Sequence, residues 1–334
     1  MFLALTADHR FWKKDEKILF LGEWCRLYRN REIWTKLDSE VFPYHWDDRE
    51  KLYRDYLYLD ELYETCFIKI AKRMNEIHNV DRSDRYWRII IGPWLYHFIQ
   101  ILYDRYLSVS SVINSKKDIH TWLPRLEPAI YIPQDFDSFG EYVVGDGYNH
   151  YLYGRIIAKL GRIPYQIKDF EMQFNFSRRK ISLMNKGKLL AKNIFGYLAK
   201  VVPSCLNKVV FVSSYLNPLD IFRLQASLGQ IPCPIMPMLQ TENIAIDLSL
   251  RNNLRLNLGE SPFEKILQEL LFEQIPAVYL EGFSTFNHKA SSAYPRKPRV
   301  IYTANGVISQ EGFKFWAAAQ VESGAKLEIG RAHV

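Results

Sequence analysis

The densest run of apolar and aromatic residues in the chain, Asp84–Leu107, predicts a buried helix. Its uninterrupted apolar part, Ile89–Tyr96, is far shorter than the roughly 20 residues that a membrane-spanning helix needs. Pro93 follows Gly92, and a proline here should kink or split the helix because it lacks a backbone donor and clashes with the preceding turn. A broken helix with polar groups at the break is typical of the wall of a cleft. The alternative is a core helix whose polar side chains are all hydrogen-bonded.

A second long helix is predicted before this one. Apolar residues recur every three or four positions from Leu52 to Ile77, which gives one continuous stripe and a helix that ends near His78. Asp47 and Glu50 have the spacing of a capping box at its start.

Three short apolar runs come still earlier, and we predict that they are buried strands of an α/β fold: Phe2–Thr6, Lys17–Gly22 and Val41–Tyr44. Polar residues stand at or just beyond the carboxyl end of each run. In an open α/β sheet, ligands bind at that edge. Thr6, Asp8, Glu23 and His45 are therefore expected to lie there.

The remainder of the chain continues this mixture of helices and strands. The pattern predicts strands at Ala129–Ile132, Lys208–Ser213 and Ala277–Leu280, a loop at Pro133–Gly147, and helices at Tyr148–Leu160, Ser182–Val202, Pro218–Leu228 and Pro262–Glu273. Tyr294–Pro298 has the composition of a linker. After it we expect a strand at Val300–Thr303, a turn, a helix at Gln310–Glu322 and a strand at Lys326–Ile329, which would open a second α/β domain.

Composition and charge narrow the class of protein. Apolar residues make up 48% and charged residues 24%, as in ordinary globular proteins. The net charge of +7 favours anionic partners. The basic residues gather only at Arg178–Lys180 and at Lys186, Lys188 and Lys192, which fits either a solvated face or a contact with phosphate or a membrane surface. Aromatic residues do not interleave with these cations, so we expect no nucleic-acid partner.

The cysteines and the amino terminus carry no special signal. The four cysteines have neither metal-ligand spacing nor the pattern of a disulfide framework, so neither a metal nor a cofactor is expected. Met1–Ala7 is apolar but lacks the basic start of a signal peptide. We therefore expect a cytoplasmic protein, with peripheral contact with the inner membrane.

The last residues, Glu328–Val334, read EIGRAHV. The DNA string GAG ATC GGA AGA GCA CAC GTC encodes them, and it resembles a common sequencing adapter. We expect this tail to be non-native and the reading frame to be truncated, and we leave the tail out of the fold prediction.

Five features of the sequence occur together: FLALTAD, KILFLGEWCRLY, PYHWDDREKLY, RYWRIIIGPWLYHFIQILYDRY, and VIYTANG with FKFWAA. In this combination they resemble a family of transferases encoded in bacterial O-antigen and lipopolysaccharide gene clusters. The resemblance implies a two-domain glycosyltransferase of the GT-B type with two Rossmann-like halves. It implies an acceptor-side α/β domain with a helical insertion at residues 1–293, a linker at 294–298, and the start of a nucleotide-sugar domain at 299–327. This fragment would then lack most of its donor-binding half and be inactive by itself.

In such a transferase a nucleotide-sugar donor meets a glycan or lipid-linked acceptor, whose hydroxyl must lose a proton. The predicted catalytic residues are His45, Asp47 and Asp48, with Trp46 as a stacking face for a sugar. The structural alternative is that Asp47 caps the helix, Asp48 favours its dipole and His45 packs in the core.

Further substrate contacts are predicted across the chain. The candidates are Asp8, Glu23, Arg88, His97, His150 with its neighbours Asp146 and Asn149, and the turn that holds Thr303, Asn305 and Gly306. The function that competes with the transferase is a non-catalytic scaffold of the polysaccharide assembly machinery.

Overall fold

The computed structural model describes residues 1–125, 127–169, 208–231 and 239–330. The predicted helix Ser182–Val202 and the basic residues between Arg178 and Lys192 lie outside the described residues, as do the prolines between 232 and 238.

One layer of parallel strands forms the amino-terminal end of the molecule. β1 (Phe2–Ala4), β2 (Ile18–Phe20) and β3 (Ser39–Val41) pair in that order, and β4 (Thr121–Pro124) pairs with β5 (Tyr165–Lys168). A parallel bridge between Phe2 and His120 joins the two groups. The strands therefore lie in the order β3-β2-β1-β4-β5. β1 and β2 are fully buried, which explains their continuous apolar sequences.

Short helical turns connect the first three strands. They are η1 (His9–Phe11), η2 (Glu23–Cys25), η3 (Tyr28–Asn30) and α1 (Arg31–Trp34). The third strand begins and ends earlier than the predicted Val41–Tyr44. Pro43 offers no backbone donor to a sheet, so the ladder stops before it.

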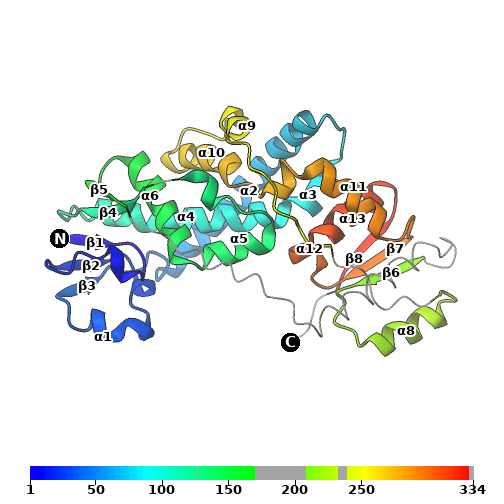
Figure 1. Ribbon diagram of the computed structural model, residues 1–334, viewed down its shortest axis with the longest axis horizontal. Coiled ribbons are helices and arrows are strands. Elements are labelled where there is room, and N and C mark those ends of the chain that lie inside the picture. Colours follow the sequence, from blue (N-terminus) through cyan, green and yellow to red (C-terminus); the bar gives the residue numbers. More distant parts are fainter. Residues whose placement is uncertain (126, 170–207, 232–238, 331–334) are drawn as a thin grey trace.

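Three helices link β3 to β4 and form the centre of the molecule (Figure 1): α2 (Arg49–His78), α3 (Asp84–Ile90) and α4 (Gly92–Asn114). The predicted break is confirmed, because α3 ends just before Ile91 and Pro93 lies in the first turn of α4. The predicted cap of α2 is wrong by one residue. The carboxylate of Asp48, not that of Asp47, accepts the N–H of Lys51 at 2.9 Å.

Two further helices follow β4: α5 (Phe136–Val143) and α6 (Asp146–Leu160). The predicted loop at residues 133–147 is wrong, because Asp135 and Ser138 form a capping box that starts α5. The strands predicted at Ala129–Ile132 and Ala277–Leu280 are also wrong. Both are 3₁₀ turns, η4 (Pro128–Tyr131) and η6 (Ala277–Tyr279), and a proline stands at or just before the start of each.

A second parallel sheet lies at the opposite end of the molecule (Figure 1), with β6 (Val209–Val212), β7 (Val300–Thr303) and β8 (Lys326–Ile329) in that order. β6 precedes the predicted linker 294–298 and β7 follows it, and β8 includes two residues of the predicted tail. The helices that follow β6 in the chain are α8 (Pro218–Ser227), α9 (Leu248–Asn253), α10 (Pro262–Gln274), α11 (Phe283–Ala293), α12 (Gly306–Ser309) and α13 (Glu311–Glu322). Of these, α10 packs on α4 and α6, away from the second sheet, and α9 packs on α10 (Figure 1).

A continuous core joins the two ends. It contains strands of both sheets together with Trp87 of α3, Trp94 of α4 and Trp316 of α13, all nearly inaccessible to solvent. No helix in the described part of the chain combines the length and apolar character that a bilayer crossing requires.

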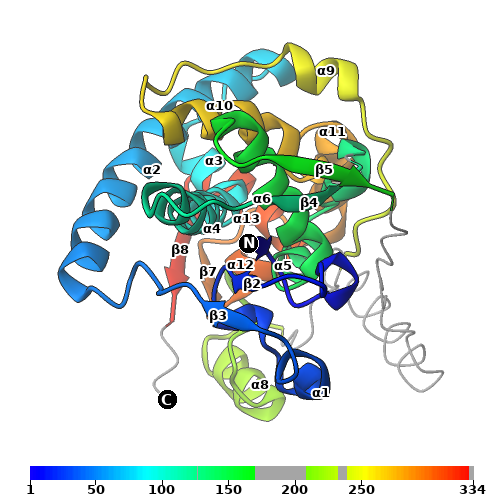
Figure 2. The same cartoon turned by 90° about the vertical axis from the view of Figure 1, so that its left-hand side faces the viewer.

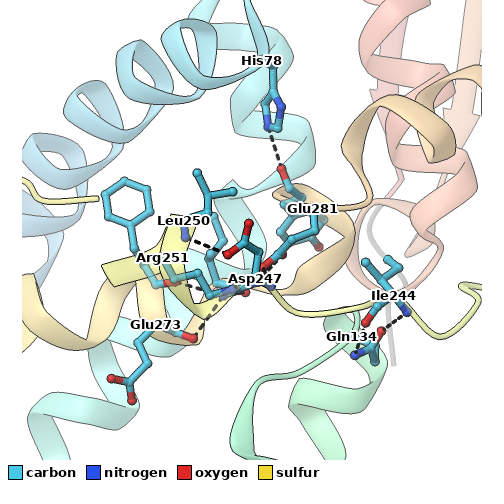
Figure 3. A network of polar contacts seen from close by, with 11 residues as sticks. His78, Gln134, Ile244, Asp247, Leu250, Arg251, Glu273 and Glu281 are labelled. Carbon is cyan, nitrogen blue, oxygen red and sulfur yellow. Dashed lines mark hydrogen bonds and ion pairs between the residues drawn. The ribbon is translucent and has the colours of Figure 1, made fainter. Parts of the chain in front are cut away.

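A buried arginine fixes the end of α10 within this core (Figure 3). Arg251, only 2% exposed, donates to the carbonyl oxygens of Phe272, Glu273 and Ile275 and pairs with both carboxylate oxygens of Glu281 at 2.6 Å. The guanidinium thus satisfies the backbone acceptors that the last turn of a helix leaves open.

Candidate functional site

A cavity of about 790 Å³ lies at the carboxyl ends of β1, β2 and β3. Figure 2 looks at this end of the molecule, with the helices α4, α5 and α6 beside the strands. The residues that line the cavity are Thr6, Glu23, Trp24, Leu27, Arg29, Val41, Phe42, Pro43, Tyr44, Asp47, Asp104, Arg105, Val143, Val144, Gly145, Asp146, Asn149 and Tyr153. Thr6 and Glu23 thus lie at the carboxyl edge of the sheet, as the sequence predicted, and both line this cavity.

The polar residues that follow β1 and β2 differ in burial and in their hydrogen-bond partners. Thr6 is 2% exposed, and its hydroxyl has no hydrogen-bond partner in the described part of the chain. Glu23 is exposed and receives three hydrogen bonds from Arg26, at 2.8 to 3.1 Å. Asp8 does not line the cavity, because its carboxylate caps η1 and binds Arg10. Thr6 thus differs from Glu23 and Asp8 at this edge, because its polar group is buried and no described residue bonds to it.

A network centred on Asp104 of α4 forms one wall of the cavity. Its Oδ1 accepts the Tyr44 hydroxyl at 2.7 Å and lies 3.3 Å from His45 Nε2, while its Oδ2 pairs with Arg105. Arg105 Nε in turn donates to Asn149 Oδ1 at 3.0 Å. Burial raises the pKa of Asp104, but the adjacent His45 imidazole, the charge of Arg105 and the Tyr44 hydroxyl outweigh it and lower the pKa. The carboxylate therefore stays ionised and rigidly held.

Asp146, the first residue of α6, lines the cavity near the end of β1. Its Oδ1 accepts the backbone N–H of Ala7 at 3.1 Å. Burial raises the pKa of this carboxyl above its usual range. Asn149 supports the same corner, because its amide donates to the carbonyl oxygens of Val143 and Gly145.

The structure separates the three predicted catalytic residues. Asp47 is exposed and lines the cavity. The side chain of His45 is only 3% exposed and faces Asp104. His45 does not itself line the cavity, whereas Asp104 does. Asp48 is the cap of α2, and the indole of Trp46 donates to Asp55 at 2.8 Å. Neither Asp48 nor Trp46 lines the cavity, and Asp48 has the capping role that the sequence pattern predicted for Asp47.

The two predicted substrate contacts on the central helices, Arg88 and His97, bind other groups of the protein. Arg88 makes a two-pronged ion pair with Glu64 at 2.7 and 2.8 Å. His97 is exposed, and its Nδ1 lies 2.7 Å from the carbonyl oxygen of Pro93. Neither residue lines the cavity. The pair at Arg88 stabilises the junction of α2 and α3, because the guanidinium also stacks on a ring of α2.

His150, a predicted substrate contact, is a core residue and does not line the cavity. It is 2% exposed, and its Nε2 lies 3.0 Å from the carbonyl oxygen of Trp122. Burial lowers its pKa to about 4, so the imidazole is neutral at physiological pH.

Thr303, Asn305 and Gly306 belong to the second sheet, at the opposite end of the molecule from the cavity (Figure 1). The Thr303 hydroxyl accepts the N–H of Gly306 at 2.9 Å, and the Asn305 amide donates to the Tyr215 hydroxyl at 2.8 Å. The structure therefore does not bring this turn together with Asp47.

Sequence reasoning missed Tyr44, Asp104 and Arg105 as site residues. Asp104 and Arg105 interrupt an otherwise apolar helix, and a charged pair that is almost wholly covered is a known marker of functional sites. The described residues include no group of three or more His, Cys, Asp or Glu side chains arranged to hold a metal ion.

Neither the curated proteins nor the solved structures gave a match to the chain. A family model described as LIC12162 family transferase matches residues 1–333. A match over this length covers both sheets, the central helices and the cavity, so the chain belongs to the LIC12162 family of transferases.

Proposed function

We propose that the protein transfers a sugar from a nucleotide-sugar to a hydroxyl of a glycan or lipid-linked acceptor during assembly of bacterial O-antigen or another surface polysaccharide. Membership of a transferase family supports group transfer. The observation that carries the proposal is the cavity at the carboxyl edge of β1–β3, which combines Trp24 and Tyr44 with the carboxylates of Asp47 and Asp146. Aromatic faces and hydrogen-bond acceptors are the groups that bind sugars.

The strand order supports a GT-B-like architecture. β3-β2-β1-β4-β5 is the order of a doubly wound nucleotide-binding half, and in such sheets ligands bind where the order reverses, here between β1 and β4. The turn that holds Thr303, Asn305 and Gly306 lies beside the sheet β6-β7-β8 at the opposite end of the molecule (Figure 1), so in this proposal the nucleotide-sugar that meets Asp47 does not contact it. The protein would work at the cytoplasmic face of the inner membrane, where lipid-linked acceptors are found.

Asp47 is the proposed general base of the transfer. It accepts the proton of the acceptor hydroxyl, the oxygen forms the new bond to the anomeric carbon, and the bond from that carbon to the phosphate oxygen breaks with its electron pair leaving on the nucleoside diphosphate. Asp47 is exposed in the cavity, so donor and acceptor both have access to it. His45 and Asp104 hold Tyr44 in place beside it.

Asp47→Asn and Asp48→Asn form a matched pair that tests the proposal. Each variant, and His45→Ala, is introduced into the chromosomal gene, and the surface polysaccharide is measured by gel electrophoresis. Loss of a general base lowers the rate by about 10²–10⁴-fold, so Asp47→Asn should abolish the polysaccharide while Asp48→Asn keeps it. Unchanged polysaccharide in a folded Asp47→Asn protein would favour the scaffold function instead.

A further inference from the structure

Two polar groups that line the cavity, one on Thr6 and one on Asp146, have no hydrogen-bond partner among the described residues. The Thr6 side chain is buried, and no described residue donates to or accepts from its hydroxyl. Asp146 uses Oδ1 to hold the N–H of Ala7, and its Oδ2 receives no hydrogen bond from the residues that the structure describes. We propose that Thr6 and Asp146 form a subsite for a pair of hydroxyls on an uncharged sugar of the acceptor, an inference that rests on the proposed role of the cavity as the acceptor site.

The backbone fixes the two groups relative to each other. Thr6 follows β1 and Asp146 begins α6, and the hydrogen bond from Ala7 ties these elements together at 3.1 Å. Because both positions are set by regular elements and not by a long loop, little order has to be gained on binding. One sugar hydroxyl donates to Asp146 Oδ2, and its neighbour shares a hydrogen bond with Thr6 Oγ1.

The charges of the cavity favour an uncharged ligand over a phosphate. Its carboxylates are Glu23, Asp47, Asp104 and Asp146, and its cations are Arg29 and Arg105. Arg105 is already paired with Asp104. A phosphate at the inner end would therefore lie beside the carboxylate of Asp146 with Arg29 as the cation left to balance it. Like charges at such short range disfavour binding, whereas hydroxyl donors suit a carboxylate.

Thr6 of the proposed subsite is less accessible to solvent than Asp47, the proposed general base. Asp47 is exposed, Asp146 is half-buried and Thr6 is 2% exposed, so the donor reaches Asp47 more readily than it reaches Thr6. Contacts remote from the reacting atoms usually stabilise the bound substrate and the transition state to the same extent. They then change the affinity for the substrate and not the rate of the chemical step. We therefore expect Thr6 and Asp146 to set the affinity and identity of the acceptor sugar, and Asp47 to set the rate.

Binding of simple sugars to the 334-residue chain tests the subsite directly. The probes are D-glucose, D-galactose, D-mannose and L-rhamnose, with inorganic phosphate as the charged alternative, and the readout is saturation-transfer NMR and calorimetry. At least one sugar should bind. Thr6→Val and Asp146→Asn should each weaken it about tenfold, since each removes one polar contact to the ligand. The asparagine keeps an oxygen for the N–H of Ala7, so the fold is preserved.

Two control variants match these changes outside the cavity. Asp137 lies in the first turn of α5, as Asp146 does in α6, and burial raises its pKa to about 6. Thr35 is an exposed threonine whose hydroxyl donates to the carbonyl oxygen of Arg31. Asp137→Asn and Thr35→Val should leave sugar affinity unchanged within about twofold.

Three results would overturn the subsite. One is that no sugar binds the wild-type chain; another is that sugar binding is the same in Thr6→Val and Asp146→Asn. The third is saturable phosphate binding that strengthens in Asp146→Asn, which would identify an anion site. These results are separate from the test of Asp47. Loss of polysaccharide in Asp47→Asn with unaltered sugar binding in the Thr6 and Asp146 variants would keep the transferase and remove this subsite.

Discussion

The hydroxyl of Tyr44 donates a 2.7 Å hydrogen bond to Oδ1 of Asp104, which connects the segment after β3 to the middle of α4 across 60 residues of sequence. The same carboxylate faces His45 and Arg105. One acidic side chain of the central helix therefore organises the wall of the cavity. We expect the positions of Tyr44, His45 and Arg105 to depend on this carboxylate.

Asp104→Asn should destabilise the protein by about 3 kcal/mol, because Arg105 would lose its counter-charge. The folded-state pKa of Asp104 is lowered, so its contribution is complete above the unfolded value of about 3.9 and is lost as the pH falls through the folded value. Urea unfolding at pH 7 measures the effect. Asp15→Asn, at an exposed position, should change the free energy of unfolding by less than about 0.5 kcal/mol. Equal losses in the two variants would argue against the network.

His150 should make the protein less stable in mild acid. Its folded pKa of about 4 lies below the unfolded value of about 6.5, so the contribution is present above pH 6.5 and is lost as the pH falls from there toward 4. The shift corresponds to roughly 3 kcal/mol. Unfolding of wild type and His150→Gln should be compared between pH 7 and pH 4, and the loss in this range should be smaller in the variant. An identical pH profile would contradict a neutral, buried imidazole.

Arg251→Met should cost about 3–5 kcal/mol, because it leaves Glu281 charged without its partner and exposes the carbonyl oxygens at the end of α10 (Figure 3). Arg255→Met, at an exposed position close by, should cost less than about 0.5 kcal/mol. Combining Arg251→Met with Glu281→Gln measures the coupling, and the double variant should be more stable than the sum of the single losses predicts. Strict additivity would mean that the two residues act independently.

Asp48→Ala should lower the free energy of unfolding by about 1 kcal/mol, because it removes the side chain that accepts the N–H of Lys51 at the start of α2. Asp47→Ala should leave stability within about 0.5 kcal/mol of wild type, since Asp47 lies outside the helix and is exposed. Thermal unfolding of the two adjacent variants gives the comparison. A larger loss of stability in Asp47→Ala than in Asp48→Ala would indicate that Asp47 is the cap of α2.

Much of the secondary structure could be predicted from the sequence because its signals are local. Pro93 after Gly92 predicted the separation of α3 and α4, and the runs Val300–Thr303 and Lys326–Ile329 predicted β7 and β8 with their observed bounds. Proline geometry and hydrophobic periodicity act within a few residues, so no distant contact is needed to recognise them. The same reasoning mistook η4 and η6 for strands, because a short apolar run does not show whether a partner strand lies beside it.

By itself the sequence determined a mixed α/β chain, its long central helices, and a set of polar residues at the ends of the first strands. Only the tertiary structure decided which of these share a site. Ala7 and Asp146 are 139 residues apart in the chain and hydrogen-bonded in the fold, while Asp47 and Asp48 are adjacent in the chain and have different roles. The physical reason is that a cavity is made where strand ends and helices pack together, and the direction of each side chain there depends on partners that no short stretch of sequence contains.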